Sequence, residues 1–424
     1  MKIAFLASRK GYLKVMGSLI QATIDRGHEA LLVVDPGERK PGEASTRTDL
    51  GHWPAARVVA HRWGQPMLLP RLREAGADAL VGPSLHFVLA AMGLAADMAA
   101  ARAAGVRLYS VDYVLETLTS DPEAYRVVDV TFYATEYERR LHWELLADRF
   151  ASVAREMSLE ARSAVSGSTM LDQLARVDRP ATRRRLKIAE GRPVVLLMSL
   201  KMAVPEPYRR LAWAGGWRGW RAAKALATGH RALVPTILRG NGYQALAEAL
   251  RGFSRRAGAS LVVKSRVKNA DPTFLRRRAD LFIERDEDVF PYTSIELVAI
   301  SDLCVHFQSG AVLEAALAGV PSLSIRVPQT HLKEYASFEE VFGAKPGSMQ
   351  NFPGMVWSMD AAEATRRLAT ASLADFPVDE GVRRRYIETF LGFDDMRSSG
   401  RVLDLIEDAG RVNVGGRPAA APRA

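Results

Sequence analysis

Short apolar runs alternate with amphipathic stretches through the first third of the chain. Residues 2–7 and 30–34 are apolar runs typical of buried strands, and residues 13–26 carry apolar side chains at helical spacing. Gly27 follows the helical stretch, at the position where a glycine commonly ends a helix. This order of strand, helix and strand predicts the opening of a parallel α/β sheet.

The same alternation continues further along the chain. Strand patterns lie at residues 79–81, 106–111 and 130–134, and helical patterns lie at residues 87–104 and 136–146. Because parallel strands need crossover connections that pack on the sheet, this alternation predicts a doubly wound domain with helices on both faces.

A second alternating series follows. Apolar strand runs lie at residues 194–200, 260–264 and 281–284, and residues 301–325 predict a strand, a tight turn, a helix and another strand. The predicted fold class is α/β, with two tandem doubly wound, Rossmann-like domains that face a cleft. In open parallel sheets, ligands bind beyond the carboxyl ends of the strands.

The pattern changes between the two series and again at the end of the chain. We expect an N-terminal domain over residues 1–160, a linker region over 161–193 and a C-terminal domain over 194–409. Residues 410–424 are rich in Gly, Pro, Ala and Arg and lack periodicity, which predicts a disordered tail.

Composition supports an ordinary globular protein. The chain has 424 residues, of which 48% are hydrophobic and 25% are charged, and this length favours two or three domains. The single cysteine, Cys304, excludes an intrachain disulfide. The apolar start is shorter than a signal peptide core, and no uncharged apolar run reaches the roughly 18 residues of a membrane span. A cytoplasmic protein is expected.

The formal net charge is +10, which favours anionic partners such as nucleic acid, anionic lipid or phosphorylated substrates. The arginines form short, scattered clusters typical of solvated helix faces, so charge does not choose among these partners. No aromatic RNA-binding motif is present, and we expect no nucleic-acid partner. A protein that holds nucleotides or RNA without chemistry stays as an alternative.

The turn Gln308-Ser309-Gly310 is the strongest candidate for a binding site. A glycine between strand and helix lets a phosphate approach the backbone, and the first N–H groups of the helix supply donors with a partial positive charge. Glu314, one turn further on, can accept hydrogen bonds from ribose hydroxyls. Alternatively, Ser309 caps the helix and Glu314 only favours its N-terminus electrostatically.

Three cations stand at predicted strand ends of the second series. Lys201, Lys264 and Arg266 suit the stabilisation of a leaving diphosphate, although each could be an ordinary surface charge. The candidates for a catalytic base are near strand ends of the first series: His86, Asp112 and Glu116. For these three residues, packing, capping or a surface position is the alternative.

No motif points to a metal. The eight histidines are scattered, without a His-x-x-x-His pair. We therefore expect no metal ligands and a metal-independent mechanism.

Three tryptophans share the spacing of one helical face. Trp213, Trp217 and Trp220 are interleaved with arginine and lysine, a combination suited to a membrane interface or a lipid-linked acceptor. Nearby glycines weaken the helix, and an aromatic cover on the domain or a dimer contact is the alternative.

Over roughly residues 160–330, the order of motifs resembles the C-terminal half of GT-B enzymes. This class includes nucleotide-sugar glycosyltransferases, UDP-GlcNAc 2-epimerase and CDP-glycerol-type transferases. The matching stretches are VSGSTMLD at 165–172, the strand and basic turn at 196–201, VVKSR at 262–266, residues 292–302, the turn Ser309-Gly310 followed by Glu314, and GVPSLSIR at 319–326.

This resemblance implies that Ser309 and Gly310 meet the diphosphate of a UDP- or CDP-linked donor, or the single phosphate of a CMP-linked donor, and that Glu314 meets its ribose. It also implies that the N-terminal domain holds the acceptor, a glycan or lipid-linked molecule, and that no further cofactor is needed. The epimerases have an acidic residue where this chain has Gln308 and a histidine where it has Arg266, so sugar transfer ranks above epimerization.

A further likeness concerns YIETFLGFDDMRSSGR at residues 386–401, which is similar to the closing segment of capsule and CDP-glycerol-type transferases. The expected function is a glycosyltransferase of surface-polysaccharide biosynthesis, located in the cytoplasm or peripherally at the inner membrane face. Transfer of a polyol phosphate and epimerization of UDP-GlcNAc are the alternatives within this class.

Overall fold

The structure, a computed structural model, divides into two compact units. The first unit comprises Met1–Arg176, Asp288–Thr293 and Ile387–Ala424, and the second comprises Val177–Glu287 and Ser294–Tyr386. The described residues are 1–7, 10–35, 50–61, 68–85, 103, 105–111, 123–149, 151–156, 162–199, 218–229, 231, 234, 242–265, 273–284, 290–326 and 345–414.

The first unit is built on a seven-stranded sheet in which every strand pairs in parallel, in the order β3-β2-β1-β4-β5-β6-β7. Its strands are β1 (Lys2–Leu6), β2 (Glu29–Val34), β3 (Arg57–Ala60), β4 (Ala79–Pro83), β5 (Arg107–Val111), β6 (Val130–Tyr133) and β7 (Ser163–Val165). The strand order reverses between β1 and β4, which places a topological switch point there.

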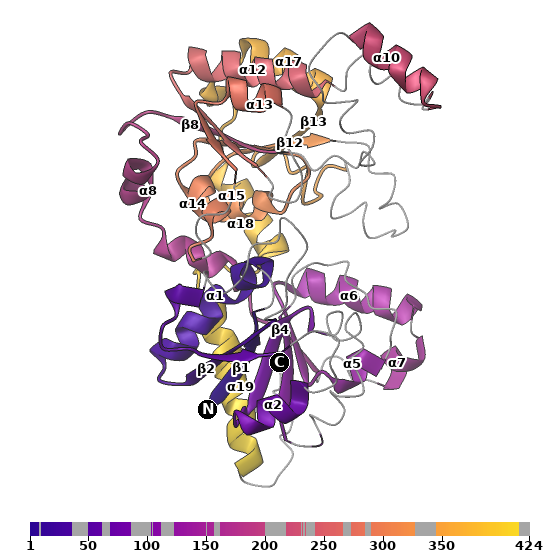
Figure 1. Cartoon of the computed structure of the whole chain (residues 1–424), viewed down its shortest axis with the longest axis vertical. Coiled ribbons are helices and arrows are strands. Elements are labelled where there is room, and N and C mark those ends of the chain that lie inside the picture. The colour runs from indigo at the N-terminus through magenta and orange to yellow at the C-terminus, as the bar shows by residue number, and fades with distance from the viewer. Residues whose placement is uncertain are drawn as a thin grey trace. The chain divides into compact units, whose positions relative to one another are not determined.

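Helices cover this sheet on both faces (Figure 1). They are α1 (Lys10–Asp25), α2 (Leu68–Glu74), α5 (Glu123–Val127), α6 (Glu136–Arg149), α7 (Ala151–Glu156), the 3-10 helix η3 (Leu171–Arg176) and α19 (Ser398–Val414). α1 and α19 share one face of the sheet, and α2 packs on the other.

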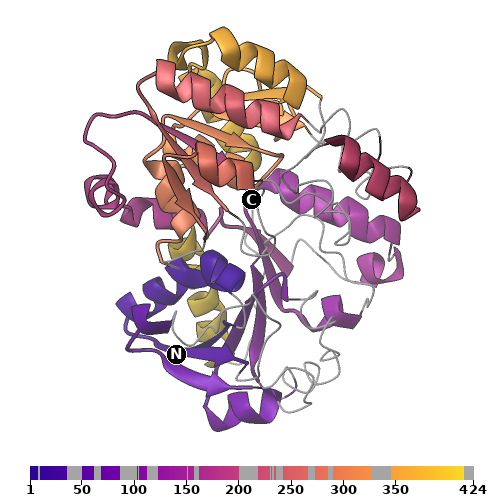
Figure 2. The same cartoon turned by 45° about the horizontal axis from the view of Figure 1, so that its top comes forward.

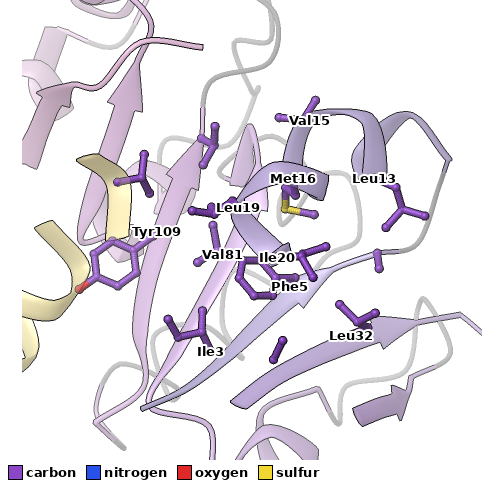
Figure 3. Close-up of a cluster of buried hydrophobic side chains, with 14 of the residues drawn as sticks. Ile3, Phe5, Leu13, Val15, Met16, Leu19, Ile20, Leu32, Val81 and Tyr109 are labelled. Carbon is purple, nitrogen blue, oxygen red and sulfur yellow. The ribbon is translucent and has the colours of Figure 1, made fainter. Parts of the chain in front are cut away.

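The alternation of side chains along each strand builds two core layers. On β1, Phe5 points into the layer under α1, whereas Leu6 joins the layer under α2. Figure 3 shows Met16 and Leu19 of α1 lying against the sheet beside Phe5 and Val81. These side chains are fully buried, so the strand patterns of the sequence correspond to strands covered on both faces.

The second unit is built on a six-stranded parallel sheet with the order β10-β9-β8-β11-β12-β13. Its strands are β8 (Val194–Met198), β9 (Ser260–Lys264), β10 (Leu281–Ile283), β11 (Leu303–His306), β12 (Ser322–Arg326) and β13 (Val356–Asp360).

α12 and α17 lie side by side on one face of this sheet, as both cartoon views show (Figure 1, Figure 2), while α14 and α15 pack on the other. The helices of the second unit are α8 (Arg179–Arg185), α10 (Arg218–Ala227), α12 (Tyr243–Arg256), α13 (Thr273–Arg278), α14 (Thr293–Ala299), α15 (Ala311–Ala318), α17 (Ala361–Thr370), η5 (Leu373–Asp375) and α18 (Glu380–Phe390). Two of these helices include residues of the first unit: Thr293, the first residue of α14, and residues 387–390 of α18.

The predicted α/β class with two doubly wound sheets is confirmed. Predicted strands at 79–81, 106–111 and 130–134 correspond to β4, β5 and β6, and the helix predicted at 136–146 is α6. The helix predicted at 87–104 lies outside the described residues, apart from position 103.

The two compact units differ from the predicted domain bounds at three places. The expected linker 161–193 divides after Arg176, and residues 288–293 and 387–409 belong to the first unit instead of the second. The helix α19 also continues to Val414, past the expected start of the tail at 410. The physical reason is that Val402, Leu403 and Ile406 are buried in the same core layer as α1.

None of the helices within the described ranges combines the length and the apolar content that crossing a bilayer requires.

Candidate functional site

The turn after β11 lies at the topological switch point of the second sheet. The chain runs from β8 outward to β9 and β10, and from β11 outward in the opposite direction to β12 and β13. Residues 307–310 follow the carboxyl end of β11 directly and lead into α15. Open parallel sheets bind ligands at this position, because the loops on either side of the reversal separate there.

The backbone of this turn has an unusual conformation at one residue. Gln308 has φ +44°, in the left-handed region that side chains other than glycine rarely adopt. Gly310 is the N-cap of α15 with an ordinary φ of −58°, and a Cβ placed on it meets no heavy atom of the described residues within 4 Å. Among the described residues, none therefore occupies the position of a Gly310 side chain.

The first N–H groups of α15 are weakly engaged by the protein. The Ala311 N–H is 3.4 Å from the Ser309 hydroxyl, a long contact, and no described residue accepts a hydrogen bond from the Gly310 N–H. Gly310 rather than Ser309 is the N-cap, so the alternative of a serine-capped helix has little support. The arrangement offers two backbone donors to an anion.

Glu314 is buried, with 1% of its surface exposed. It lies near Cys304: burial raises the pKa of the Cys304 thiol well above its usual range, and the negative charge of Glu314 raises it further. The Glu314 carboxylate thus lies one turn into the helix, on the side of Cys304. Its role toward a ribose stays a prediction.

Lys264 ends β9, next to β8 at the switch point. Its side chain is buried, and its Nζ donates a hydrogen bond of 2.7 Å to the Ser265 carbonyl. The other predicted cations, Lys201 and Arg266, lie outside the described residues, as do the predicted bases His86, Asp112 and Glu116. The sequence-predicted residues that the structure brings together are therefore Gln308, Ser309, Gly310 and Glu314.

Two buried residues next to the turn were missed by the sequence analysis. The Nδ1 atom of His306 accepts the Ser309 N–H at 3.3 Å, and the Gln350 amide donates to the Ser309 carbonyl at 3.3 Å. A polar residue at the end of a buried strand is a signal that could have found His306. No local pattern marks Gln350, which is 41 positions from Ser309.

Burial lowers the pKa of His306 to about 3, so the imidazole is neutral near pH 7 and its Nδ1 can accept a hydrogen bond. In the described part of the chain, no group of three or more His, Cys, Asp or Glu side chains is arranged to hold a metal ion.

Comparison of the whole chain with known proteins gives structural likeness without sequence likeness. No protein family and no curated protein matches the sequence. The fold, however, is of the GT-B type, shared with nucleotide-sugar enzymes of known structure, and the predicted resemblance is confirmed at the level of the fold.

Three solved structures illustrate this likeness. UDP-GlcNAc 2-epimerase from Neisseria meningitidis, bound to UDP-GlcNAc, has a TM-score of 0.59 at 11% identity, covering 96% of this chain and 100% of that chain. The wall teichoic acid polymerase TagF has a TM-score of 0.57 at 10% identity, covering 98% and 90%. UDP-N-acetylglucosamine 2-epimerase from Rickettsia bellii has a TM-score of 0.52 at 13% identity, covering 98% and 99%.

Proposed function

We propose that this protein is a nucleotide-sugar-dependent glycosyltransferase that moves a sugar from a UDP-, CDP- or CMP-linked donor to a glycan or lipid-linked acceptor in surface-polysaccharide biosynthesis. The observation that carries the proposal is the open turn Ser309-Gly310 at the switch point of the second sheet. In this proposal the two N–H groups there bind the donor diphosphate, and Glu314, in the first turn of α15, accepts hydrogen bonds from the attached ribose.

The chemistry asks for charge stabilisation on the leaving group. When the sugar is transferred, negative charge develops on the diphosphate, and backbone donors fixed at a helix N-terminus stabilise it without reorganising. Lys201, Lys264 and Arg266 are the proposed cations of this site, and His86, Asp112 or Glu116 the proposed base for the acceptor hydroxyl. The groups that hold the turn, His306 and Gln350, add no negative charge next to the diphosphate.

Epimerization of UDP-GlcNAc is the second candidate. The fold neighbours from Neisseria meningitidis and Rickettsia bellii are UDP-GlcNAc 2-epimerases, and the first was solved with UDP-GlcNAc bound. At 11 and 13% identity these likenesses concern the fold alone. The sequence resemblance implies an acidic residue and a histidine in an epimerase where this chain has Gln308 and Arg266. Transfer therefore remains the first candidate.

A polyol-phosphate transferase is the third. TagF, a wall teichoic acid polymerase, shares the fold over 98% of this chain. A CDP-linked polyol would present its diphosphate to the same turn, so the two kinds of transferase differ in the donor and not in the binding motif.

Calorimetry with UDP-, GDP-, CMP- and CDP-linked donors tests the proposal. We expect one nucleotide class to bind at micromolar affinity or better, and no binding by any of them would overturn the proposed function. NMR of UDP-GlcNAc incubated with the enzyme and no acceptor then separates the candidates: appearance of the C2 epimer identifies an epimerase, while an unchanged sugar favours a transferase.

For the acceptor, we propose contact with a membrane surface that presents a lipid-linked substrate. Trp220 on α10 is 59% exposed, and the Lys224 Nζ lies 5.2 Å from the centre of its ring. Ala222 and Ala225 are buried, so Trp220 is on the side of the helix that faces away from the packed side. Trp213 and Trp217 lie outside the described residues. An exposed aromatic residue beside a cation suits the interface of an anionic bilayer.

A further inference from the structure

The backbone of Ser309 is held from both sides by buried side chains. Its N–H donates to the Nδ1 of His306 at 3.3 Å, and its carbonyl accepts from the Nε2 of Gln350 at 3.3 Å. His306 and Gln350 are both 0% exposed. The peptide groups on either side of Ser309 therefore have fixed directions.

A second layer of hydrogen bonds holds Gln350 itself. The Ser324 hydroxyl, on the neighbouring strand β12, donates to the Gln350 Oε1 at 2.9 Å. The Tyr386 hydroxyl on α18 donates to the carbonyl of the adjacent residue Met349 at 3.0 Å, and Tyr386 is fully buried. Burial raises the pKa of Tyr386 well above its usual range, so its hydroxyl keeps the proton that it donates.

The turn needs such support because one of its residues is strained. Holding a residue such as Gln308 at φ +44° costs about 1 to 2 kcal/mol, and this conformation persists only where the surroundings determine it. The fixed Ser309 peptides set the path of the chain into Gly310, and with it the direction of the Gly310 and Ala311 N–H groups.

We propose that His306 and Gln350 are positioning residues that aim the Gly310 and Ala311 N–H groups at the diphosphate of the donor. This proposal rests on the proposed function of the turn as a diphosphate site. Donors that are fixed before the ligand arrives do not lose orientational freedom on binding. Preorganisation therefore raises the affinity for the ligand and strengthens the stabilisation of the transition state. Neither residue touches the ligand; both act through Ser309.

Matched variants separate this role from simple packing. His306→Leu removes the acceptor, whereas His306→Asn keeps an acceptor oxygen at the position of Nδ1. Gln350→Met removes both hydrogen bonds at similar volume. Ser324→Ala removes the support of Gln350, and Ser322→Ala is its control, because Ser322 is equally buried on β12 but its hydroxyl has no hydrogen-bond partner among the described residues.

The first measurement is amide hydrogen exchange of the peptide that covers residues 307–313, in the full-length protein without nucleotide. We expect faster exchange in His306→Leu, Gln350→Met and Ser324→Ala, and wild-type exchange in Ser322→Ala. His306→Asn should restore most of the protection. Equal exchange in wild type and in His306→Leu would overturn the positioning role, whether or not the protein binds nucleotides.

The second measurement is calorimetry with UDP and with CDP. For the nucleotide that wild type binds, we expect about tenfold weaker binding in His306→Leu and Gln350→Met, as loss of roughly 1.4 kcal/mol implies. His306→Asn and Ser322→Ala should remain within about threefold of wild type. If wild type binds and His306→Leu binds equally well, the inference is wrong. If wild type binds neither nucleotide nor any donor of the calorimetric panel, the proposed function fails instead, and exchange still decides whether the turn is held.

Discussion

The carboxylate of Asp172 accepts the backbone N–H of Ser399 at 2.6 Å, although the two residues are 227 positions apart. The same carboxylate accepts the Ser398 N–H at 3.1 Å, so it caps the first turn of α19 from a distant part of the chain. Gly167 is equally constrained: at φ +84°, an added Cβ would lie 2.4 Å from the Ser398 hydroxyl oxygen. This pair of contacts holds the C-terminal helix in the first unit.

Replacing Asp172 should loosen α19. Asp172→Ala leaves two buried N–H groups without their acceptor, and we expect α19 to lose about 2 kcal/mol of protection, while Asp172→Asn should lose about half as much. Hydrogen exchange of α19 measures this loss. Asp178→Ala is the control, since Asp178 accepts the Ala181 N–H in α8 and should not change exchange in α19.

The effect of Asp172→Asn should also depend on pH. Burial raises the pKa of Asp172, and the hydrogen bonds from Ser398 and Ser399 only partly oppose that rise. A raised pKa in the folded state means that folding takes up a proton. The stabilisation is complete below the ordinary value of 3.8 and is lost as pH rises through the folded-state value. The difference between wild type and Asp172→Asn should therefore grow as the pH falls toward 4. A difference that stays constant would contradict this account.

The two glycines that flank α15 should respond oppositely to alanine. Gly310 has φ −58°, and its Cβ position is free of heavy atoms from the described residues, so Gly310→Ala should leave stability unchanged or raise it by about 0.5 kcal/mol. Its methyl group would occupy the space of the proposed diphosphate, and we expect at least about tenfold weaker nucleotide binding.

Gly319→Ala is the matched control at the other end of the helix. Gly319 has φ +70°, and an alanine there should cost about 1 kcal/mol without changing nucleotide affinity. Thermal unfolding measures the stability of both variants, and calorimetry measures their nucleotide affinity. Unchanged nucleotide affinity in Gly310→Ala would remove the turn from the proposed binding site.

Sequence alone predicts the features of this molecule that depend on neighbouring residues. It does not predict the features that depend on residues far apart along the chain. The strands and helices follow from local periodicity, because a parallel sheet covered on both faces needs apolar strands such as 2–6 and amphipathic crossovers such as 10–25. The packing of α19 depends on Asp172, 227 positions before Ser399, and no local pattern reveals it.

The candidate site shows the same division. Ser309 and Gly310 are recognisable because a strand-to-helix turn that carries glycine is a local feature. Gln350 is not, because its role depends on a loop that returns to the turn 41 positions later. The sequence suggested Lys264 as a cation for a leaving diphosphate, with an ordinary surface charge as the alternative. Its side chain is buried and donates a hydrogen bond to the Ser265 carbonyl, which contradicts the surface alternative.

A ligand that lacks ribose hydroxyls tests the assignment of Glu314. Glu314→Gln keeps the shape of the side chain but removes its charge, and it should weaken binding of the preferred nucleoside diphosphate by about tenfold, the range of a charge-assisted hydrogen bond. The 2′,3′-dideoxy analogue of that nucleotide should bind wild type and Glu314→Gln equally. Calorimetry on the two proteins with the two ligands forms a thermodynamic cycle. If Glu314→Gln lost the same affinity for both ligands, a contact between Glu314 and the ribose would be ruled out.

Exposed apolar residues of α10 should support binding to anionic membranes. Trp220→Ser and Leu226→Ser each remove an apolar group that is exposed by 59 and 49%, and both should reduce sedimentation with vesicles that contain phosphatidylglycerol. Leu405→Ser is the control, because Leu405 is 40% exposed on α19. Vesicles of phosphatidylcholine alone should bind all forms weakly. If Leu405→Ser reduces sedimentation as much as the α10 variants do, the contact is nonspecific.

A buried histidine should make the first unit sensitive to acid. His142 on α6 is 3% exposed and meets the rings of Tyr125 and Tyr133 edge-on, with centroid distances of 6.1 and 5.4 Å. Burial lowers the pKa of His142 from 6.5 to about 4. Below pH 6.5 the unfolded chain binds a proton that the folded unit excludes, so stability is complete above that value and is lost as the pH falls toward 4.

The loss amounts to about 3 kcal/mol, since one pKa unit corresponds to about 1.4 kcal/mol. His142→Phe keeps an aromatic ring between the tyrosines and removes the titrating group, so its stability should fall less between pH 7.5 and pH 4.5. Hydrogen exchange of β6 and α6 reports on the first unit alone, which matters because His306 in the second unit also has a lowered pKa. At pH 7.5 His142 is neutral in both the folded and the unfolded chain, so wild type and His142→Phe differ only in packing. An equally steep loss in His142→Phe would show that other groups cause the acid sensitivity.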